Sequence, residues 1–253
     1  INLIGMVQII LNKIKYYLFF SLTLFFSCFS IFSNPFNDLS QAFNNWYIEH
    51  HPNRFNLVDP YIIYEKNKFG ADKASHVAAL EAALHALESK SVKDQLLGVN
   101  AFFDEHIQYA TDDIVFKEKD YWATPSELFG HSRGDCEDYA IAKYVALLHL
   151  GIDSSKLRLI YVKAKIGRSR VTQAHMVLGY YDTPSSDPLV LDSLVSNVLP
   201  GSQRTDLIPV FSFNDSGIWQ PGKTAQVSSS TSRLSRWRDV IERMKQEGIS
   251  RRS

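Results

Sequence analysis

The stretch that decides the fold is Tyr121-Trp-Ala-Thr-Pro-Ser-Glu-Leu-Phe-Gly-His-Ser-Arg-Gly-Asp-Cys-Glu-Asp-Tyr-Ala-Ile-Ala-Lys-Tyr-Val-Ala-Leu-Leu148. It leads from a polar loop through Gly134 into an apolar segment with helical spacing, and Cys136 lies where that helix should begin. The first turn of a helix carries unpaired N–H groups and a partial positive charge, and both favour an anion such as a thiolate. The position therefore makes Cys136 a candidate nucleophile, with a small buried apolar residue as the alternative.

The N-terminal segment has the pattern of a targeting sequence. Two lysines precede an apolar run that ends at Phe32, and polar residues follow at once. This order is typical of a secretory signal peptide, so we expect residues 1–33 to be removed on export, with a retained N-terminal anchor or lipidation at Cys28 as alternatives. Loss of Cys28 would leave Cys136 as the sole cysteine of the mature chain, which excludes an internal disulfide.

Length and composition suit a globular protein. The chain has 253 residues, of which 45% are hydrophobic and 21% charged, and its formal net charge is 0. This charge balance gives no indication of a nucleic-acid partner. After the signal peptide we expect an N-terminal helical part (34–95), a core (96–225) and a C-terminal helical tail with a solvated face (226–253).

Hydrophobic periodicity predicts helices followed by strands. Two helices, the second with an N-cap at Ser91, should form a hairpin over 71–108, and a buried helix that ends at Gly151 should begin near Cys136. The region 109–134 between them has the character of a long loop. Segments in which apolar and polar residues alternate predict strands at 157–164, 174–181, 189–194 and 207–213. Helical spacing of apolar residues predicts further helices at 38–47 and 233–246. Helices before an antiparallel sheet indicate an α+β fold.

A cysteine nucleophile needs a base, and the base needs a group that orients it. Among eight histidines, His175 stands at the start of a predicted strand, and Asp192 lies on the next strand across a turn at 182–188. Adjacent antiparallel strands bring such side chains within hydrogen-bonding reach of each other. Cys136, His175 and Asp192 are therefore candidates for a catalytic triad, and a purely structural histidine beside an unrelated aspartate is the alternative.

Three acids crowd the cysteine: Asp135, Glu137 and Asp138. The dipole of a helix favours acids in its first turn, which is one explanation. Carboxylates beside a thiol also raise its pKa and oppose its activation, and a bound hard cation would offset that effect. Clustered carboxylates suit Ca²⁺, so the three acids are candidate metal ligands. Further ligands from 109–122 stay open between Asp112, Asp113 and backbone carbonyls.

Acyl transfer also requires hydrogen-bond donors for the oxyanion. The backbone N–H of Cys136 is the natural first donor. The Trp122 indole is a candidate second donor, with a place in the core or in the wall of the substrate site as the alternative.

Several motifs around these residues resemble one family. They are Asp120-Tyr-Trp-Ala-Thr-Pro125, Gly134-Asp-Cys-Glu-Asp138, Ala140-Ile-Ala-Lys-Tyr144, His175-Met-Val-Leu178 and Leu189-Val-Leu-Asp192. The order of cysteine, histidine and aspartate resembles the transglutaminase-like branch of the papain-type cysteine enzymes. Within this branch the motifs resemble the LapG-type bacterial periplasmic proteases, although Ser193 stands where such proteins often have Asn.

The resemblance implies Cys136 as nucleophile, His175 as base and Asp192 as the residue that orients the base, with the catalytic helix packed on a short antiparallel sheet. It also implies calcium dependence through the three acids, and a periplasmic location. The implied substrate is the N-terminal region of a large surface adhesin, whose cleavage would release the adhesin and control biofilm attachment. The implied inhibitory partner is an inner-membrane cyclic-di-GMP receptor of the LapD kind. Transglutaminase-like acyl transfer and a non-catalytic calcium-binding adaptor are the alternative functions.

Overall fold

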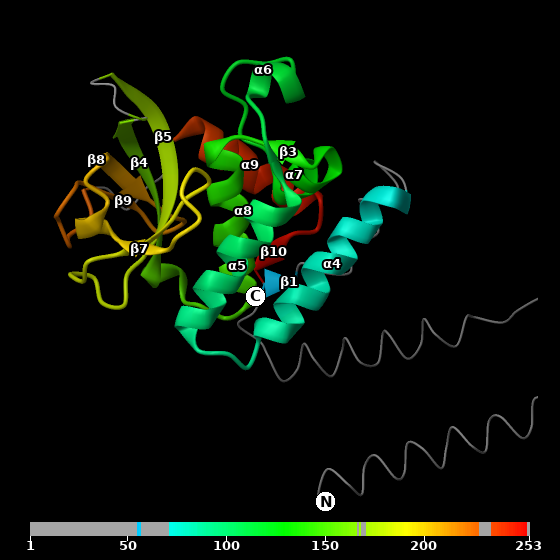
Figure 1. Cartoon of the computed structure of the whole chain (residues 1–253), viewed down its shortest axis with the longest axis horizontal. Helices are drawn as coiled ribbons and strands as arrows, with labels where there is room; N and C mark the ends of the chain where they lie inside the picture. Colours follow the sequence, from blue (N-terminus) through cyan, green and yellow to red (C-terminus); the bar gives the residue numbers. More distant parts are fainter. Residues whose placement is uncertain (1–54, 57–70, 166, 168–170, 228–233, 252–253) are drawn as a thin grey trace, which may run out of the picture. The chain divides into compact units, whose positions relative to one another are not determined.

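A six-stranded antiparallel sheet with α-helices on one of its sides forms the fold, which confirms the predicted α+β class (Figure 1). The computed structural model describes residues 55–56, 71–165, 167, 171–227 and 234–251. The predicted signal peptide and the predicted helix at 38–47 lie outside these residues. No helix within the described ranges combines the length and the apolarity needed to cross a bilayer.

The strands run in the order β7-β6-β5-β4-β8-β9 across the sheet. They are β4 (Leu157–Lys165), β5 (Thr172–Tyr180), β6 (Leu189–Leu191), β7 (Leu199–Pro200), β8 (Leu207–Phe213) and β9 (Ile218–Trp219), with the short 3₁₀ turns η1 (Ser154–Lys156) and η2 (Gly201–Gln203) between them. The four predicted strands are confirmed, but the third is shorter than expected. It ends at Leu191 because the Asp192 side chain accepts the backbone N–H of Leu194 (3.0 Å) and turns the chain out of the sheet.

The predicted helical hairpin consists of α4 (Ala71–Leu87) and α5 (Val92–His106). Ser91 caps α5 as expected, because its hydroxyl accepts the backbone N–H of Asp94 (3.2 Å). Leu96, Val99 and Phe103 recur at helical spacing along α5, and all three are buried in the main core.

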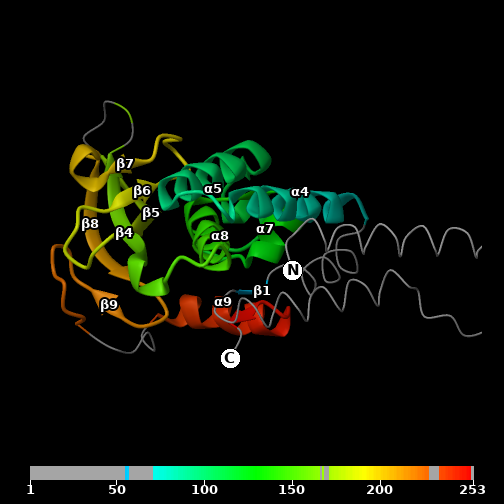
Figure 2. The ribbon, with the colours of Figure 1, turned by 90° about the horizontal axis from the view of Figure 1, so that it is seen from below.

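The helix that begins at Cys136 is the centre of the fold. All residues of α8 (Cys136–His149) are buried, and α8 packs against β5, α5 and α7. In Figure 2 this helix lies between the α4–α5 hairpin and α9, beside the sheet. It ends before Gly151, whose φ of 87° is costly for any residue with a Cβ.

The prediction of a long loop over 109–134 was wrong. This region holds β2 (Gln108–Tyr109), α6 (Asp112–Val115), α7 (Pro125–His131) and β3 (Arg133–Gly134), and β2 pairs in parallel with β3. Thr124 and Glu127 form a reciprocal capping box at the start of α7, where Pro125 is tolerated in the first turn. The ordered connection brings α6 next to the start of α8.

The last helix is more than a solvated tail. Trp237, Val240 and Met244 of α9 (Ser235–Gln246) are buried in the main core, and the Trp237 ring packs edge-to-face on Tyr144 of α8 (centroids 5.8 Å apart). After α9, β10 (Ser250–Arg251) pairs with β1 (Phe55–Asn56). The charged face of the helix is exposed as predicted, but its apolar face completes the core.

Candidate active site

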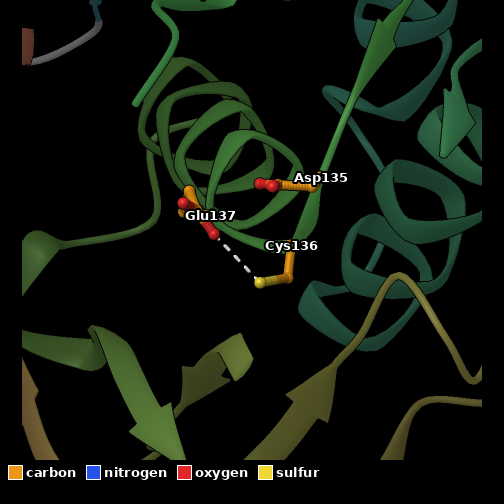
Figure 3. Close-up of side chains that lie close together, drawn as sticks. All are labelled: Asp135, Cys136 and Glu137. Carbon is orange, nitrogen blue, oxygen red and sulfur yellow. Dashed lines mark hydrogen bonds between the residues drawn. The ribbon is translucent and has the colours of Figure 1, made fainter. Parts of the chain in front are cut away.

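Cys136 is the first residue of α8, and the N-cap Asp135 and Glu137 flank it (Figure 3). The Cys136 thiol donates a hydrogen bond to Glu137 Oε2 (Sγ–Oε2 2.9 Å) and is only 9% exposed. Burial, followed by the charge of Glu137, raises the pKa of the Cys136 thiol, while the backbone N–H of Met176 on β5 opposes the shift. The cysteine therefore sits at the interface of α8 and β5, with its thiol protonated in this arrangement.

His175 and Asp192 form a buried hydrogen-bonded pair. His175 Nε2 lies 2.7 Å from Asp192 Oδ1, and the two residues are 3% and 1% exposed. The other carboxylate oxygen, Oδ2, accepts a hydrogen bond from Arg204 (2.7 Å). Burial alone would raise the pKa of Asp192, but the hydrogen bond and charge of His175, together with Leu194 N–H and Arg204, lower it to about 2. Asp192 is therefore an anion that orients the His175 ring through Nε2.

A buried lysine holds the backbone of Asp192. Lys143 Nζ, from the middle of α8, donates to the Asp192 carbonyl (3.1 Å) and also to Asn100 Oδ1 (2.8 Å) and Asp104 Oδ1 (3.0 Å) of α5. Lys143 and Arg204 are not among the residues predicted from the sequence. A charged residue between apolar residues in the middle of α8 is a visible signal for Lys143, whereas nothing in the local sequence distinguishes Arg204.

Cys136 and His175 line the same cavity of about 960 Å³, and Asp192 lies behind the histidine. Trp122, Tyr161 and Phe211 contribute aromatic walls to this cavity. The Trp122 indole N–H donates to Asp120 Oδ1 (3.2 Å), and its ring stacks on Phe213 (centroids 5.9 Å apart). In this arrangement Trp122 forms part of the wall, while the Cys136 backbone N–H at the helix start remains the natural oxyanion donor.

Carboxylates gather beside the cysteine. One oxygen each from Asp112, Asp135 and Asp138 lies within 4.8 Å of the others, and Asp135 forms a second such group with Cys136 and Glu137. Asp138 is anchored, because its oxygens accept the backbone N–H groups of Ala123 (2.7 Å) and Asp135 (3.1 Å). The structure thus places the predicted acids in two groups that share Asp135, one with Glu137 and one with Asp138, and it adds Asp112 from α6 to the second group.

The electrostatics of this acidic cluster fit a cation. Burial and neighbouring acids raise the pKa of Asp112 to about 6 and that of Asp135 to about 8, and they also raise the pKa values of Glu137 and Asp138. Asp112 Oδ1 and Asp135 Oδ1 are buried without a hydrogen-bond partner among the described residues. Hard, clustered oxygen ligands of this kind suit Ca²⁺.

A thiol at a helix start that shares a cavity with a histidine, itself bonded to a buried aspartate, defines a thiol-enzyme class of site. The family profile of the bacterial transglutaminase-like cysteine proteinases (BTLCP) matches residues 64–220, so the chain belongs to this family. The predicted resemblance to LapG-type proteases is confirmed.

Solved structures of Legionella pneumophila LapG are similar to this chain. The EGTA-treated form is 38% identical with a TM-score of 0.63 over 73% of this chain and 97% of that chain. The calcium-bound form is 40% identical with a TM-score of 0.62 over 72% of this chain and 97% of that chain. In a sequence comparison, no curated protein matches the chain.

Proposed function

We propose that the protein is a calcium-dependent cysteine endopeptidase with Cys136 as nucleophile, His175 as general base and Asp192 as the orienting residue. One observation carries the proposal: His175, which is held by buried Asp192 (2.7 Å), lines the same cavity as Cys136 at the start of α8. Family membership and the calcium-bound LapG relative support the reaction class and the ion.

The residues suggest the following order of events. The Cys136 thiol turns from Glu137 and gives its proton to Nδ1 of His175, because Nε2 is held by Asp192. The thiolate attacks the scissile carbonyl, and the Cys136 backbone N–H donates to the oxyanion. His175 then protonates the leaving amine and activates the water that hydrolyses the acyl-enzyme.

Asp112, Asp135, Glu137 and Asp138 would hold the calcium ion. One buried oxygen each of Asp112 and Asp135 has no hydrogen-bond partner among the residues that the structure describes, which supports this assignment. When bound, the ion would supply the positive charge that offsets the acids around Cys136 and fixes the α6 connection against α8.

The triad is tested without assuming a substrate. Iodoacetamide alkylation of Cys136, followed by mass spectrometry in calcium, reports how readily the thiolate forms. His175→Asn should slow alkylation at least about tenfold, since the base is lost. His85→Asn, on the exposed surface of α4, is the matched control and should leave the rate unchanged. Equal rates in both variants would remove His175 from its assigned role.

Two adjacent acids of α6 provide a variant and its matched control for testing the calcium site. Asp112 is buried in the acidic cluster, whereas Asp113 is exposed. Calcium bound only to the folded state should raise the melting temperature, and EGTA should reverse the rise. Asp112→Asn should shrink the rise and Asp113→Asn should preserve it. If both variants keep the full rise, the ion binds elsewhere.

The substrate, partner and compartment extend the proposal. On the motif resemblance to LapG-type proteases, we assign cleavage of the N-terminal region of a large surface adhesin in the periplasm, and inhibition by an inner-membrane cyclic-di-GMP receptor of the LapD kind. Incubation with such an adhesin segment from the same organism, in calcium or EGTA, would give one new cleavage product by mass spectrometry. Cys136→Ser should lower the rate by about 10⁴-fold or more. Cleavage by Cys136→Ser would refute the nucleophile assignment.

A further inference from the structure

A second cavity, of about 320 Å³, lies on the face of the sheet that is turned away from α8. Its apolar floor comprises four buried residues from β4, β5 and β6 that form an apolar cluster separate from the main core: Ile160, Val162, Val177 and Val190. Figure 1 places the labelled α-helices on the other side of the sheet, so no described α-helix covers this floor. The loops at 184–188 and 220–224 form its rim.

Arg158 lines this cavity, and its environment is unusual for a cation. It is 4% exposed, and its guanidinium lies 4.5 Å from the Tyr181 ring centroid and 4.1 Å from the Trp219 centroid. Its Nε is buried without a hydrogen-bond partner in the described part of the chain. A buried charge without an anion is costly, and burial accordingly lowers the pKa of Arg158.

The other buried cations of the described residues have anionic partners. Lys143 pairs with Asp104 (3.0 Å), and Arg204 pairs with Asp192 and with Asp206 (2.7 Å each). Arg158 has no such carboxylate within 4.0 Å among the described residues. In the described part of the chain, Arg158 is therefore the buried Lys or Arg side chain that has no carboxylate partner.

The remaining polar groups of the cavity favour an anion. Arg204 also lines it, and NH1 of Arg204 is buried without a partner among the described residues. Exposed Lys223 lies at the rim. Asp187 is an acid in the lining, but both of its oxygens accept hydrogen bonds from Ser202 (2.6 to 3.3 Å).

We propose that this cavity is a binding site for a small organic carboxylate with an apolar body. The guanidinium lies over the Tyr181 and Trp219 rings, and its Nε is left without a partner among the described residues. A carboxylate can accept two parallel hydrogen bonds from a guanidinium. The apolar body of the ligand packs on the floor of β4, β5 and β6. Phe211 lines both this cavity and that of Cys136, and Arg204 also bonds Asp192, but Arg158 and the apolar floor lie outside the cavity of Cys136, and the site does not depend on the proposed protease activity.

Three probes of equal chain length test the proposal on the unmodified protein: hexanoate, hexan-1-ol and hexylammonium. Titration is followed by methyl NMR shifts of Ile160, Val177 and Val190. Hexanoate should bind saturably. Hexan-1-ol should bind at least about tenfold more weakly, because it cannot form a charge-assisted hydrogen bond with the guanidinium. Hexylammonium should not bind, because its positive charge is repelled by that of Arg158. Equal binding of hexanoate and hexan-1-ol, no binding of hexanoate, or shifts confined to Met176 in the other cavity would overturn the proposal.

Variants then assign the charge. Arg158→Gln should weaken hexanoate binding at least about tenfold. Arg238→Gln makes the same change on the exposed face of α9 and should leave binding unchanged. Alkylation of Cys136 should be the same in both variants, because Arg158 has no place in the catalytic site. Full hexanoate affinity in folded Arg158→Gln would also overturn the proposal, and the probe series decides the matter if that variant does not fold.

Discussion

Replacement of Lys143 by methionine should destabilise the protein strongly, although no active-site atom is removed. Methionine keeps most of the side-chain volume and removes only the ammonium group. Lys143 Nζ hydrogen-bonds to Asn100, Asp104 and the Asp192 carbonyl, and the Lys143 side chain is 1% exposed. Loss of one partner of a buried ion pair typically costs 3 to 5 kcal/mol, because the other charge stays buried.

The Asp104 side chain is 17% exposed, so water can partly solvate the abandoned carboxylate. The lower end of the range, about 3 kcal/mol, is therefore expected. For a chain of this size that loss corresponds to a fall in melting temperature of roughly 6 to 12 °C, readable by circular dichroism.

Lys156→Met is the matched control for this experiment. Lys156 forms an ion pair of similar length (3.1 Å) with Asp182, but the two side chains are 41% and 75% exposed. Solvent screens such a pair, so its loss should leave the melting temperature unchanged within error. If Lys143→Met melts no lower than Lys156→Met, the buried network does not stabilise the fold, and the reasoning is refuted.

Three further results are expected. Arg243→Met should lower the free energy of unfolding by about 2 kcal/mol, because the Arg243 guanidinium joins α9 to Glu127 in α7. Urea unfolding measures this loss. An unchanged urea midpoint would show that the apolar face of α9 alone holds the helix in place. Gly134→Ala should shrink the calcium-induced rise in melting temperature, since the new Cβ would lie 2.6 Å from Asp138 Oδ2, and a full rise would contradict the assigned ligand set. The pKa of Asp192 is about 2, below its ordinary value of 3.8, so ionised Asp192 should add about 2 kcal/mol to the free energy of unfolding above pH 4, and this contribution should be lost as pH falls towards 2. In Asp192→Asn, the free energy of unfolding should lack this part of its acid dependence. Identical pH profiles of the variant and the unmodified protein would show that Asp192 makes no such contribution.

Helices and strands in which apolar residues recur regularly could be predicted from the sequence. The helices of the 71–108 hairpin, α8 and the four strands follow from apolar spacing, since one face of each lies in a core. The region 109–134 was misjudged because α6 and α7 are too short for a period to register. The threonine and glutamate of the α7 capping box were nevertheless visible at positions 124 and 127, and they could have predicted its start.

The candidate site could be predicted only in part. Cys136, His175 and Asp192 were named from the position of each on its element, and the structure brings the last two together at 2.7 Å. The lack of a carboxylate partner for Arg158 among the described residues could not be predicted, because it depends on what the fold places around this side chain. Asp112 could not be separated from Asp113 for the same reason: adjacent acids differ in burial only after α6 docks beside α8.

The helix α8 carries Cys136 at its first position and Lys143 seven residues later, roughly 10 Å along its axis. Because Lys143 holds the Asp192 carbonyl, one rigid element fixes the spacing between the thiol and the turn that orients His175. The aromatic cavity walls, in contrast, come from outside α8. The residues of the cavity walls can therefore be varied by directed evolution of peptide preference without changing the distance between Cys136 and the turn that orients His175. Libraries that leave α8 unchanged should retain the largest share of active clones.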